Sequence, residues 1–244
     1  MEPIYVQEFD ITDNTVDCFG RLKTSMILYF VQEVAGQHFN RICMDYDALA
    51  SRGLFWAIIR QRVQITRLPQ RGERIRVETW PMPTTRVAYP RSVVAYDEAG
   101  NECFRSIAIW VLMDVNTRSM VLPGKSGISV DGTLRGMELA APGSLVPKDL
   151  SRQAQRAVCF TDLDRNGHMN NTRYMDWIDD LLPSAFHREH SVTEFTVCYL
   201  SETREGQTLQ LHWDFLEEGT VQVDAHRISG ENAERVFSAR LIYG

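Results

Sequence analysis

Two stretches of this sequence, DCFGRLKTSMILYFVQEV (residues 17–34) and DRNGHMNNTRYMDWIDDL (residues 164–181), share one pattern. Each opens on an aspartate, Asp17 or Asp164, followed three positions later by a glycine. Each then places apolar residues at i, i+3, i+4 and i+7, which is typical of one face of a helix. These residues are Ile27, Phe30, Val31 and Val34, and then Tyr174, Trp177, Ile178 and Leu181. The chain is therefore predicted to contain one module twice.

Each repeat is predicted to form a turn followed by a long helix. Residues able to cap these helices stand at Thr24 or Ser25 and at Asn171 or Thr172. Pro183 disfavours helical backbone at the residue before it, so the second helix is predicted to end at about Leu182.

Strand patterns follow each helix. Apolar and polar side chains alternate over residues 59–66, 74–79 and 209–215, as in antiparallel strands packed on one face. Turn residues then precede a last apolar strand in each half, at residues 107–113 and 236–243. An antiparallel sheet curved around a central helix fits this order. The predicted class is α+β, a double hotdog with two such modules in tandem.

Proline and glycine punctuate residues 123–147, where apolar periodicity is lost. This segment is predicted to be a linker. The expected organisation is an N-terminal hotdog domain at residues 1–122, a linker at 123–150 and a C-terminal hotdog domain at 151–244.

The chain has 244 residues, 44% of them hydrophobic, and a formal charge of −6. An acidic balance argues against general nucleic-acid binding. RLPQRGERIR (residues 67–76) is a local basic run. It is either a docking site for an acidic partner or, as we prefer, a solvated strand–turn–strand edge.

The five cysteines form no C-x-x-C pair, which argues against a disulfide framework or a zinc site and for a reducing compartment. The start, MEPIYVQEFD, lacks the features of a signal peptide, and no apolar run reaches the roughly 18 residues of a membrane span. We expect a cytoplasmic protein without a membrane span.

The second turn begins like a calcium-binding loop. Asp162, Asp164, Asn166 and Gly167 fit the first positions of such a loop, but its twelfth position, which needs a chelating glutamate, is Arg173. Calcium is therefore disfavoured, and no metal is expected.

The two turns differ in their chemical groups. Asp17, Phe19 and Arg21 stand in the first half where the second half has Asp164, Asn166 and His168. Only the second half adds an amide and an imidazole. Turn and capping roles are the alternative interpretation of these residues.

The second turn suits thioester hydrolysis. Backbone N–H groups at a helix start and the Asn166 amide can stabilise an oxyanion, and His168 can move a proton near neutral pH. Asp164 can orient water or the histidine. Glu202, at a strand end in YLSETREG, can supply a second carboxylate, and its first-half match is Leu68. Cys198 and Cys159 are interpreted as structural rather than nucleophilic.

DLDRNGHMNNTRYMDWIDDLLP closely resembles the helix start of the acyl-acyl carrier protein thioesterases of plants and bacteria. RGERIRVETWP, AIWVLMDVNTR and YLSETREGQTL resemble other parts of that family, and the likeness covers about residues 4–243. It implies a hydrolase that releases fatty acids from an acyl carrier protein bearing a phosphopantetheine-linked acyl chain.

The resemblance implies that the catalytic residues of the family correspond here to Asp164, Asn166, His168 and Glu202, and that the reaction needs no cofactor. Plant members have a cysteine after the glutamate, whereas this chain has Thr203, which implies direct attack by activated water. The first half would bury the acyl chain. A monomer and a homodimer are both open, as are an acyl-CoA thioesterase with the same site and a non-catalytic acyl-binding hotdog protein.

Overall fold

The computed structural model describes residues 3–42, 44–229 and 232–244. Its contacts divide the chain into two units. Unit 1 comprises Met1–Leu22 and Tyr29–Pro142, and unit 2 comprises Lys23–Leu28 and Gly143–Gly244. No described helix is long and apolar enough to cross a bilayer.

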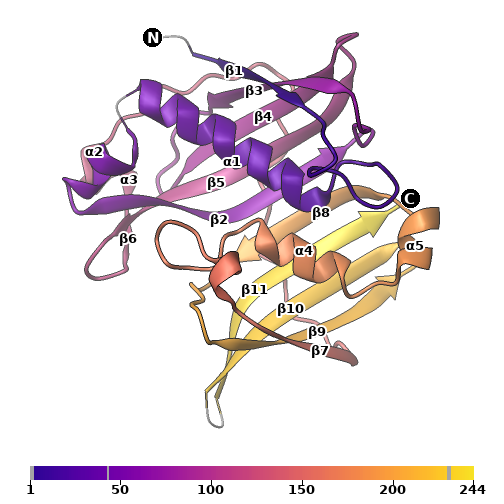
Figure 1. Ribbon diagram of the computed structural model, residues 1–244. Helices are drawn as coiled ribbons and strands as arrows, with labels where there is room; N and C mark the ends of the chain where they lie inside the picture. The colour runs from indigo at the N-terminus through magenta and orange to yellow at the C-terminus, as the bar shows by residue number, and fades with distance from the viewer. Residues whose placement is uncertain (1–2, 43, 230–231) are drawn as a thin grey trace. The chain divides into compact units, whose positions relative to one another are not determined.

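Unit 1 is an antiparallel sheet with a long helix on one face (Figure 1). Its elements are β1 (Tyr5–Asp10), α1 (Thr24–Arg41) from Tyr29 onward, α2 (Tyr46–Ala50), β2 (Leu54–Ile65), β3 (Arg74–Pro81), β4 (Tyr89–Asp97), β5 (Glu102–Asp114), β6 (Met120–Val121) and α3 (Pro123–Ser126). The first turn of α1, up to Leu28, belongs to unit 2 by its contacts. The strands pair in the order β1-β3-β4-β5-β2, with β6 beside β5. Phe30, Val31 and Val34 of α1 are buried, as their spacing predicts. Ring contacts such as Phe39 with Trp110 join α1 to the sheet.

Unit 2 repeats this plan. Its elements are β7 (Arg152–Ala157), the short 3₁₀ helix η1 (Phe160–Asp162), α4 (Arg173–Asp179), α5 (Ser184–Glu189), β8 (Val192–Tyr199), β9 (Thr208–Glu217), β10 (Thr220–Ser229) and β11 (Asn232–Tyr243). The strands pair in the order β8-β11-β10-β9-β7. Tyr174 of α4 stacks on Phe237 of β11 at 4.3 Å between ring centroids, which places α4 against this sheet (Figure 1). The predicted double hotdog is confirmed.

The second helix is shorter than predicted. We expected it to continue to about Leu182, but α4 ends at Asp179. Single turns close at Leu181 and Leu182, and Pro183 is the N-cap residue of α5, which was not predicted. His187 of α5 lies with Nε2 2.8 Å from the Asp179 backbone oxygen, so its ring satisfies a carbonyl at the helix end.

The predicted strands are confirmed. The continuous apolar run of β5 is explained by its burial on both faces. Ile107, Ile109 and Val111 form a buried cluster with Ala88, and Leu139 packs against it. Residues 108, 110 and 112 are also buried, so both faces of this strand are covered.

The segment after β6 is ordered against unit 1. Thr133 N donates to Pro81 O at 2.9 Å, and Arg105 Nη1 donates to Met137 O at 2.7 Å. A Cβ on Gly132 would lie 2.2 Å from the Met82 carbonyl carbon, so only glycine fits this approach. The contact boundary between the units falls after Pro142.

Candidate active site

The turn before α4 is built around Asp164. Its Oδ1 accepts the backbone N–H of Asn166 at 2.8 Å and that of His168 at 3.3 Å. Its own N–H donates to the His168 carbonyl at 2.7 Å, and Gly167 follows with φ of +73°. These bonds fix the backbone on either side of His168 without using the imidazole.

The turn before α1 has the same construction. Asp17 Oδ1 accepts the N–H of Phe19 at 2.8 Å and that of Arg21 at 3.0 Å, and Gly20 has φ of +79°. Because Asp17 does this work in a turn with no histidine, the contacts of Asp164 are those of a turn-forming residue. Its proposed part in catalysis is therefore indirect.

His168 and Glu202 lie together. Nε2 of His168 is 3.1 Å from Oε2 of Glu202, with the imidazole 10% and the glutamate side chain 35% exposed. A carboxylate only accepts hydrogen bonds, so we assign the hydrogen to Nε2 of the imidazole. The pair thus combines a carboxylate that water reaches with a largely buried ring.

In each unit, a matching backbone hydrogen bond joins the turn before the helix to the loop that contains Glu202 in unit 2 or Leu68 in unit 1. Met169 N donates to Thr203 O at 2.8 Å in unit 2, and Leu22 N donates to Pro69 O at 2.8 Å in unit 1. Leu68, immediately before Pro69, therefore occupies the position of Glu202. Unit 1 has a leucine and Arg21 where unit 2 has a carboxylate and an imidazole.

Two backbone donors at the start of α4 are already engaged within the chain. Oδ1 of Asn170, a residue we had not singled out, accepts the N–H of Thr172 at 2.9 Å. The N–H of Arg173 donates to Asn170 O at 3.0 Å. Thr172 is the N-cap residue, as predicted, but its side chain makes no capping bond. With these donors engaged, the exposed Asn166 amide, 3.4 Å from Asp164 Oδ2, is the better candidate oxyanion donor.

Thr203 points away from the solvent. Only 1% exposed, it lies with Oγ1 2.7 Å from the hydroxyl of Tyr174. Burial raises the pKa of Tyr174 to about 12, so this phenol stays protonated. Cys198 is also buried, whereas Cys159 is exposed and Cys43 lies outside the described residues. Sequence reasoning missed the Thr203–Tyr174 contact because it depends on how α4 packs on the loop.

The calcium alternative gains no support. Arg173, at the chelating position, pairs with Asp176 at 2.9 Å. Over the described ranges, no group of three or more His, Cys, Asp or Glu side chains could hold a metal ion.

Comparisons with known proteins agree with this architecture. Residues 2–122 match the acyl-ACP thioesterase N-terminal domain and residues 147–243 match the C-terminal domain. A palmitoyl-acyl carrier protein thioesterase of Gossypium hirsutum is 22% identical over 85% of this chain. A dodecanoyl-[acyl-carrier-protein] hydrolase of Cinnamomum camphora is 25% identical over 75% of it. This chain spans only 54% and 52% of the lengths of these two relatives.

A solved acyl-ACP thioesterase from Bacteroides thetaiotaomicron is similar in fold, with a TM-score of 0.87 and 22% identity. The match covers 99% of this chain and 98% of that one. Because both domains of one family are matched in order, the chain belongs to the acyl-ACP thioesterase family.

Proposed function

We propose that this chain hydrolyses the thioester of fatty acyl-acyl carrier protein and releases the free fatty acid. The observation that carries the proposal is the 3.1 Å pair of His168 and Glu202, built into a turn whose counterpart in unit 1 has neither group. The named activities of the plant relatives support the same reaction.

In the proposed mechanism Glu202 is the general base. The N–H of His168 holds one carboxylate oxygen, and the other takes a proton from a water molecule. The water oxygen bonds to the thioester carbon, and the Asn166 amide donates to the developing oxyanion. The tetrahedral species then collapses, the carbon–sulfur bond breaks, and the leaving thiolate takes back the proton. Asp164 acts by fixing the backbone of the loop.

We assign acyl-chain binding to unit 1. Its matched turn lacks the catalytic groups, and it holds a cavity of about 130 Å³. The residues that line this cavity are mostly apolar: Pro3, His38, Ile42, Met44, Pro81, Ser129, Val130 and Asp131. Each buried methylene of the substrate would contribute about 0.8 kcal/mol, so the depth of the apolar space would set the preferred chain length.

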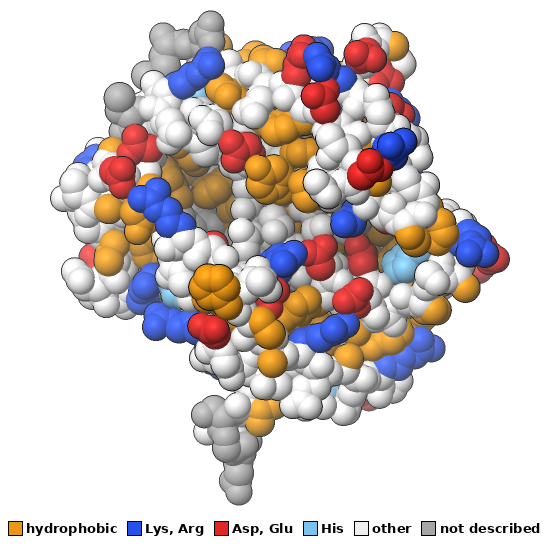
Figure 2. Space-filling model, viewed as in Figure 1, with side chains coloured by type: hydrophobic (Ala, Val, Ile, Leu, Met, Phe, Trp, Pro, Cys, Tyr) orange, Lys and Arg blue, Asp and Glu red, His pale blue; other side chains and the backbone are white. Residues whose placement is uncertain are grey.

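The carrier protein is the second part of the proposal. The basic run at residues 67–76 does not supply a ready docking patch, because its arginines pair with acidic residues: Arg67 with Glu73 and Asp97, Arg71 with Asp13, Arg74 with Asp10, and Arg76 with Glu78. Figure 2 shows acidic and basic side chains intermixed on the face in view. Docking of an acidic carrier would use local cations, and added salt would raise KM.

A thiol-release assay tests the proposal. The same acyl group is presented on acyl carrier protein and on coenzyme A, each at low and at high salt. We expect faster hydrolysis from the carrier protein, with a KM that rises with salt only for that substrate. Equal rates from both carriers would favour an acyl-CoA thioesterase. Acyl binding without thiol release would favour a non-catalytic protein. Cytoplasmic location and pairing of two chains stay predictions, the latter testable by sedimentation.

A further inference from the structure

Glu202 stands on a loop, residues 200–207 between β8 and β9, and a loop needs restraint to hold a general base in place. One restraint comes from residues that follow His168. The backbone N–H of Met169 donates to the backbone oxygen of Thr203, and the hydroxyls of Tyr174 and Thr203 are hydrogen-bonded to each other. A second comes from Arg227 on β10.

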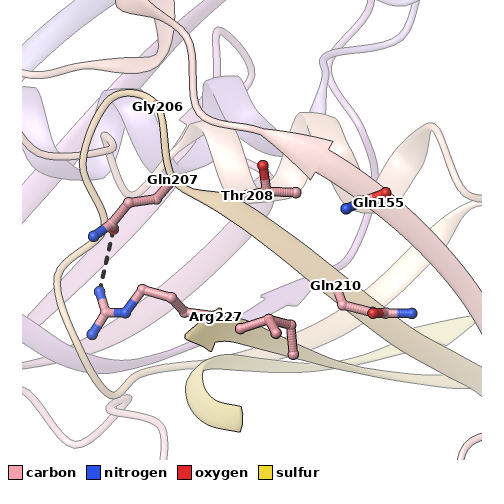
Figure 3. A pocket seen from close by; sticks show the side chains of 7 residues that line it. Gln155, Gly206, Gln207, Thr208, Gln210 and Arg227 are labelled. Carbon is pink, nitrogen blue, oxygen red and sulfur yellow. Dashed lines mark hydrogen bonds between the residues drawn. The ribbon is translucent and has the colours of Figure 1, made fainter. Parts of the chain in front are cut away.

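Arg227 contacts the loop at three points. Nη1 donates to the backbone oxygen of Glu202 at 2.8 Å and to Oε1 of Gln207 at 3.2 Å. Nη2 donates to Oγ of Ser201 at 3.3 Å. Gln207 Oε1 also accepts the N–H of Arg204 at 2.9 Å, so one guanidinium ties both ends of the loop to the sheet. Figure 3 shows the side chains of Arg227 and Gln207 facing each other.

Unit 1 handles its matching loop differently. The backbone oxygen of Leu68, which matches that of Glu202, accepts a hydrogen bond from Gln70 Nε2 at 3.0 Å, within the same loop. The strand position that matches Arg227 is Asp97, because Asp97 pairs with Ile75 in β3 as Arg227 pairs with Leu209 in β9. Asp97 binds Arg67 of the loop at 2.9 Å. Among the described residues, an arginine on a strand donates to the backbone oxygen of Glu202 in unit 2, whereas the backbone oxygen of the matching Leu68 in unit 1 accepts from Gln70.

We propose that Arg227 is a positioning residue, which holds the backbone of Glu202 so that its carboxylate meets His168. This inference rests on the proposed function. The guanidinium makes a charge-assisted bond to a peptide oxygen next to the base and does not itself meet the reacting atoms. Losing the bond would free the loop and lower the fraction of molecules in which the carboxylate is correctly placed.

The surroundings of Arg227 allow a chemical test. A polar groove of about 430 Å³ lies beside it, lined by Gln155, Gly206, Gln207, Thr208, Gln210, Arg227 and Ile228. Because Arg227 is part of the groove wall, truncation would open its place to small solutes. Added methylguanidinium could then occupy the position of the lost side chain.

The experiment compares Arg227→Ala, Arg227→Lys and the control Arg156→Ala by steady-state kinetics on acyl-acyl carrier protein, with melting curves for each. Arg156 is on β7 of the same unit and pairs with exposed Asp180. We expect Arg227→Ala to lower kcat about tenfold or more, with KM changed less than about twofold. Methylguanidinium should restore part of this loss, Arg227→Lys should be intermediate, and Arg156→Ala should match the wild type.

The double variant Arg227→Ala/Glu202→Gln separates positioning from general damage. If Arg227 acts through Glu202, the arginine change causes no further loss of kcat once the carboxylate is gone. An equal further loss in that background would overturn the inference, as would wild-type kcat in Arg227→Ala while Glu202→Gln is inactive. Full activity of Glu202→Gln would instead remove the proposed site itself. Should Arg227→Ala not fold, Arg227→Lys alone and in the Glu202→Gln background gives the same comparison.

Discussion

The turns before α1 and α4 share a backbone but not a chemistry. In both, an aspartate accepts the N–H groups two and four residues on, and a glycine takes positive φ. Arg21 and Leu68 then occupy in unit 1 the places of His168 and Glu202 in unit 2. What the fold requires is present in both turns, whereas the groups that we propose for the reaction stand in the turn before α4 and not in the matched turn before α1.

The largest expected effect comes from the imidazole. His168→Gln should lower kcat roughly a hundredfold or more, because a glutamine amide can still donate to Glu202 but cannot share its proton as the imidazole can. The matched change in unit 1, Arg21→Gln, should leave kcat within about twofold. Initial rates of thiol release measure both, with circular dichroism to verify folding. An active His168→Gln enzyme would mean that the difference between the turns is not catalytic.

Substituting the matched aspartates, Asp17 and Asp164, separates an effect on the free energy of unfolding from an effect on turnover. Asp17→Ala and Asp164→Ala should each lower the free energy of unfolding by about 1–2 kcal/mol, because two backbone donors lose their acceptor. Only Asp164→Ala should also slow turnover, by about tenfold, because its turn carries His168. Denaturant titration and initial rates test the pair. Slow turnover in Asp17→Ala and not in Asp164→Ala would reverse the assignment.

The buried Asp179 of α4 should make the free energy of unfolding depend on pH, an effect that its match in α1 cannot produce. Burial raises the pKa of Asp179 to about 6, despite the 2.7 Å bond from Thr24 Oγ1. The matched residue of α1 is the neutral Gln32. The folded protein holds the proton that the unfolded chain releases near pH 4, so the wild type should become more stable as pH falls from about 6 to 4.

Asp179→Asn should remove this dependence. At pH 7.5 the variant should be more stable than the wild type, by roughly 2–3 kcal/mol, because no buried charge remains. An asparagine oxygen still accepts from Thr24. Unfolding curves between pH 4 and 8 measure the effect, and a variant less stable than the wild type at pH 7.5 would show that the ionised carboxylate has a stabilising partner.

The smallest effect is expected at Thr203, whose match in unit 1 is Pro69. The Thr203 side chain is buried against Tyr174, so a thiol placed there would face the core. Thr203→Cys should keep kcat within about threefold and gain no sensitivity to iodoacetamide beyond that of the wild type. Strong new inactivation by the reagent would place this side chain in the reaction path.

Local patterns in the sequence predicted the repeat and its main elements. Helical spacing of apolar residues located α1 and the start of α4, and glycines in matched turns paired Glu202 with Leu68. The predicted end of α4 at about Leu182 was wrong. It relied on Pro183 to end the helix, whereas the helix ends at Asp179, whose backbone oxygen lies next to the His187 ring.

Contacts between distant segments could not be predicted. The Asn170 side chain accepts the N–H of the N-cap residue Thr172, and Arg227 contacts Glu202 because β10 pairs beside β9. Such bonds depend on sheet register and on how a loop folds back, which periodicity does not encode. The polar residues of the proposed site could be selected from the sequence, whereas the residues that contact and position them could not.

Turnover of two matched double variants tests the central claim most directly. His168→Ala/Glu202→Ala removes the pair in unit 2, and Arg21→Ala/Leu68→Ala removes its counterparts in unit 1. We predict that the first loses activity by a hundredfold or more and that the second stays within a few fold of the wild type. Comparable loss in both, or activity retained by the first, would contradict the assignment of the chemistry to the C-terminal turn.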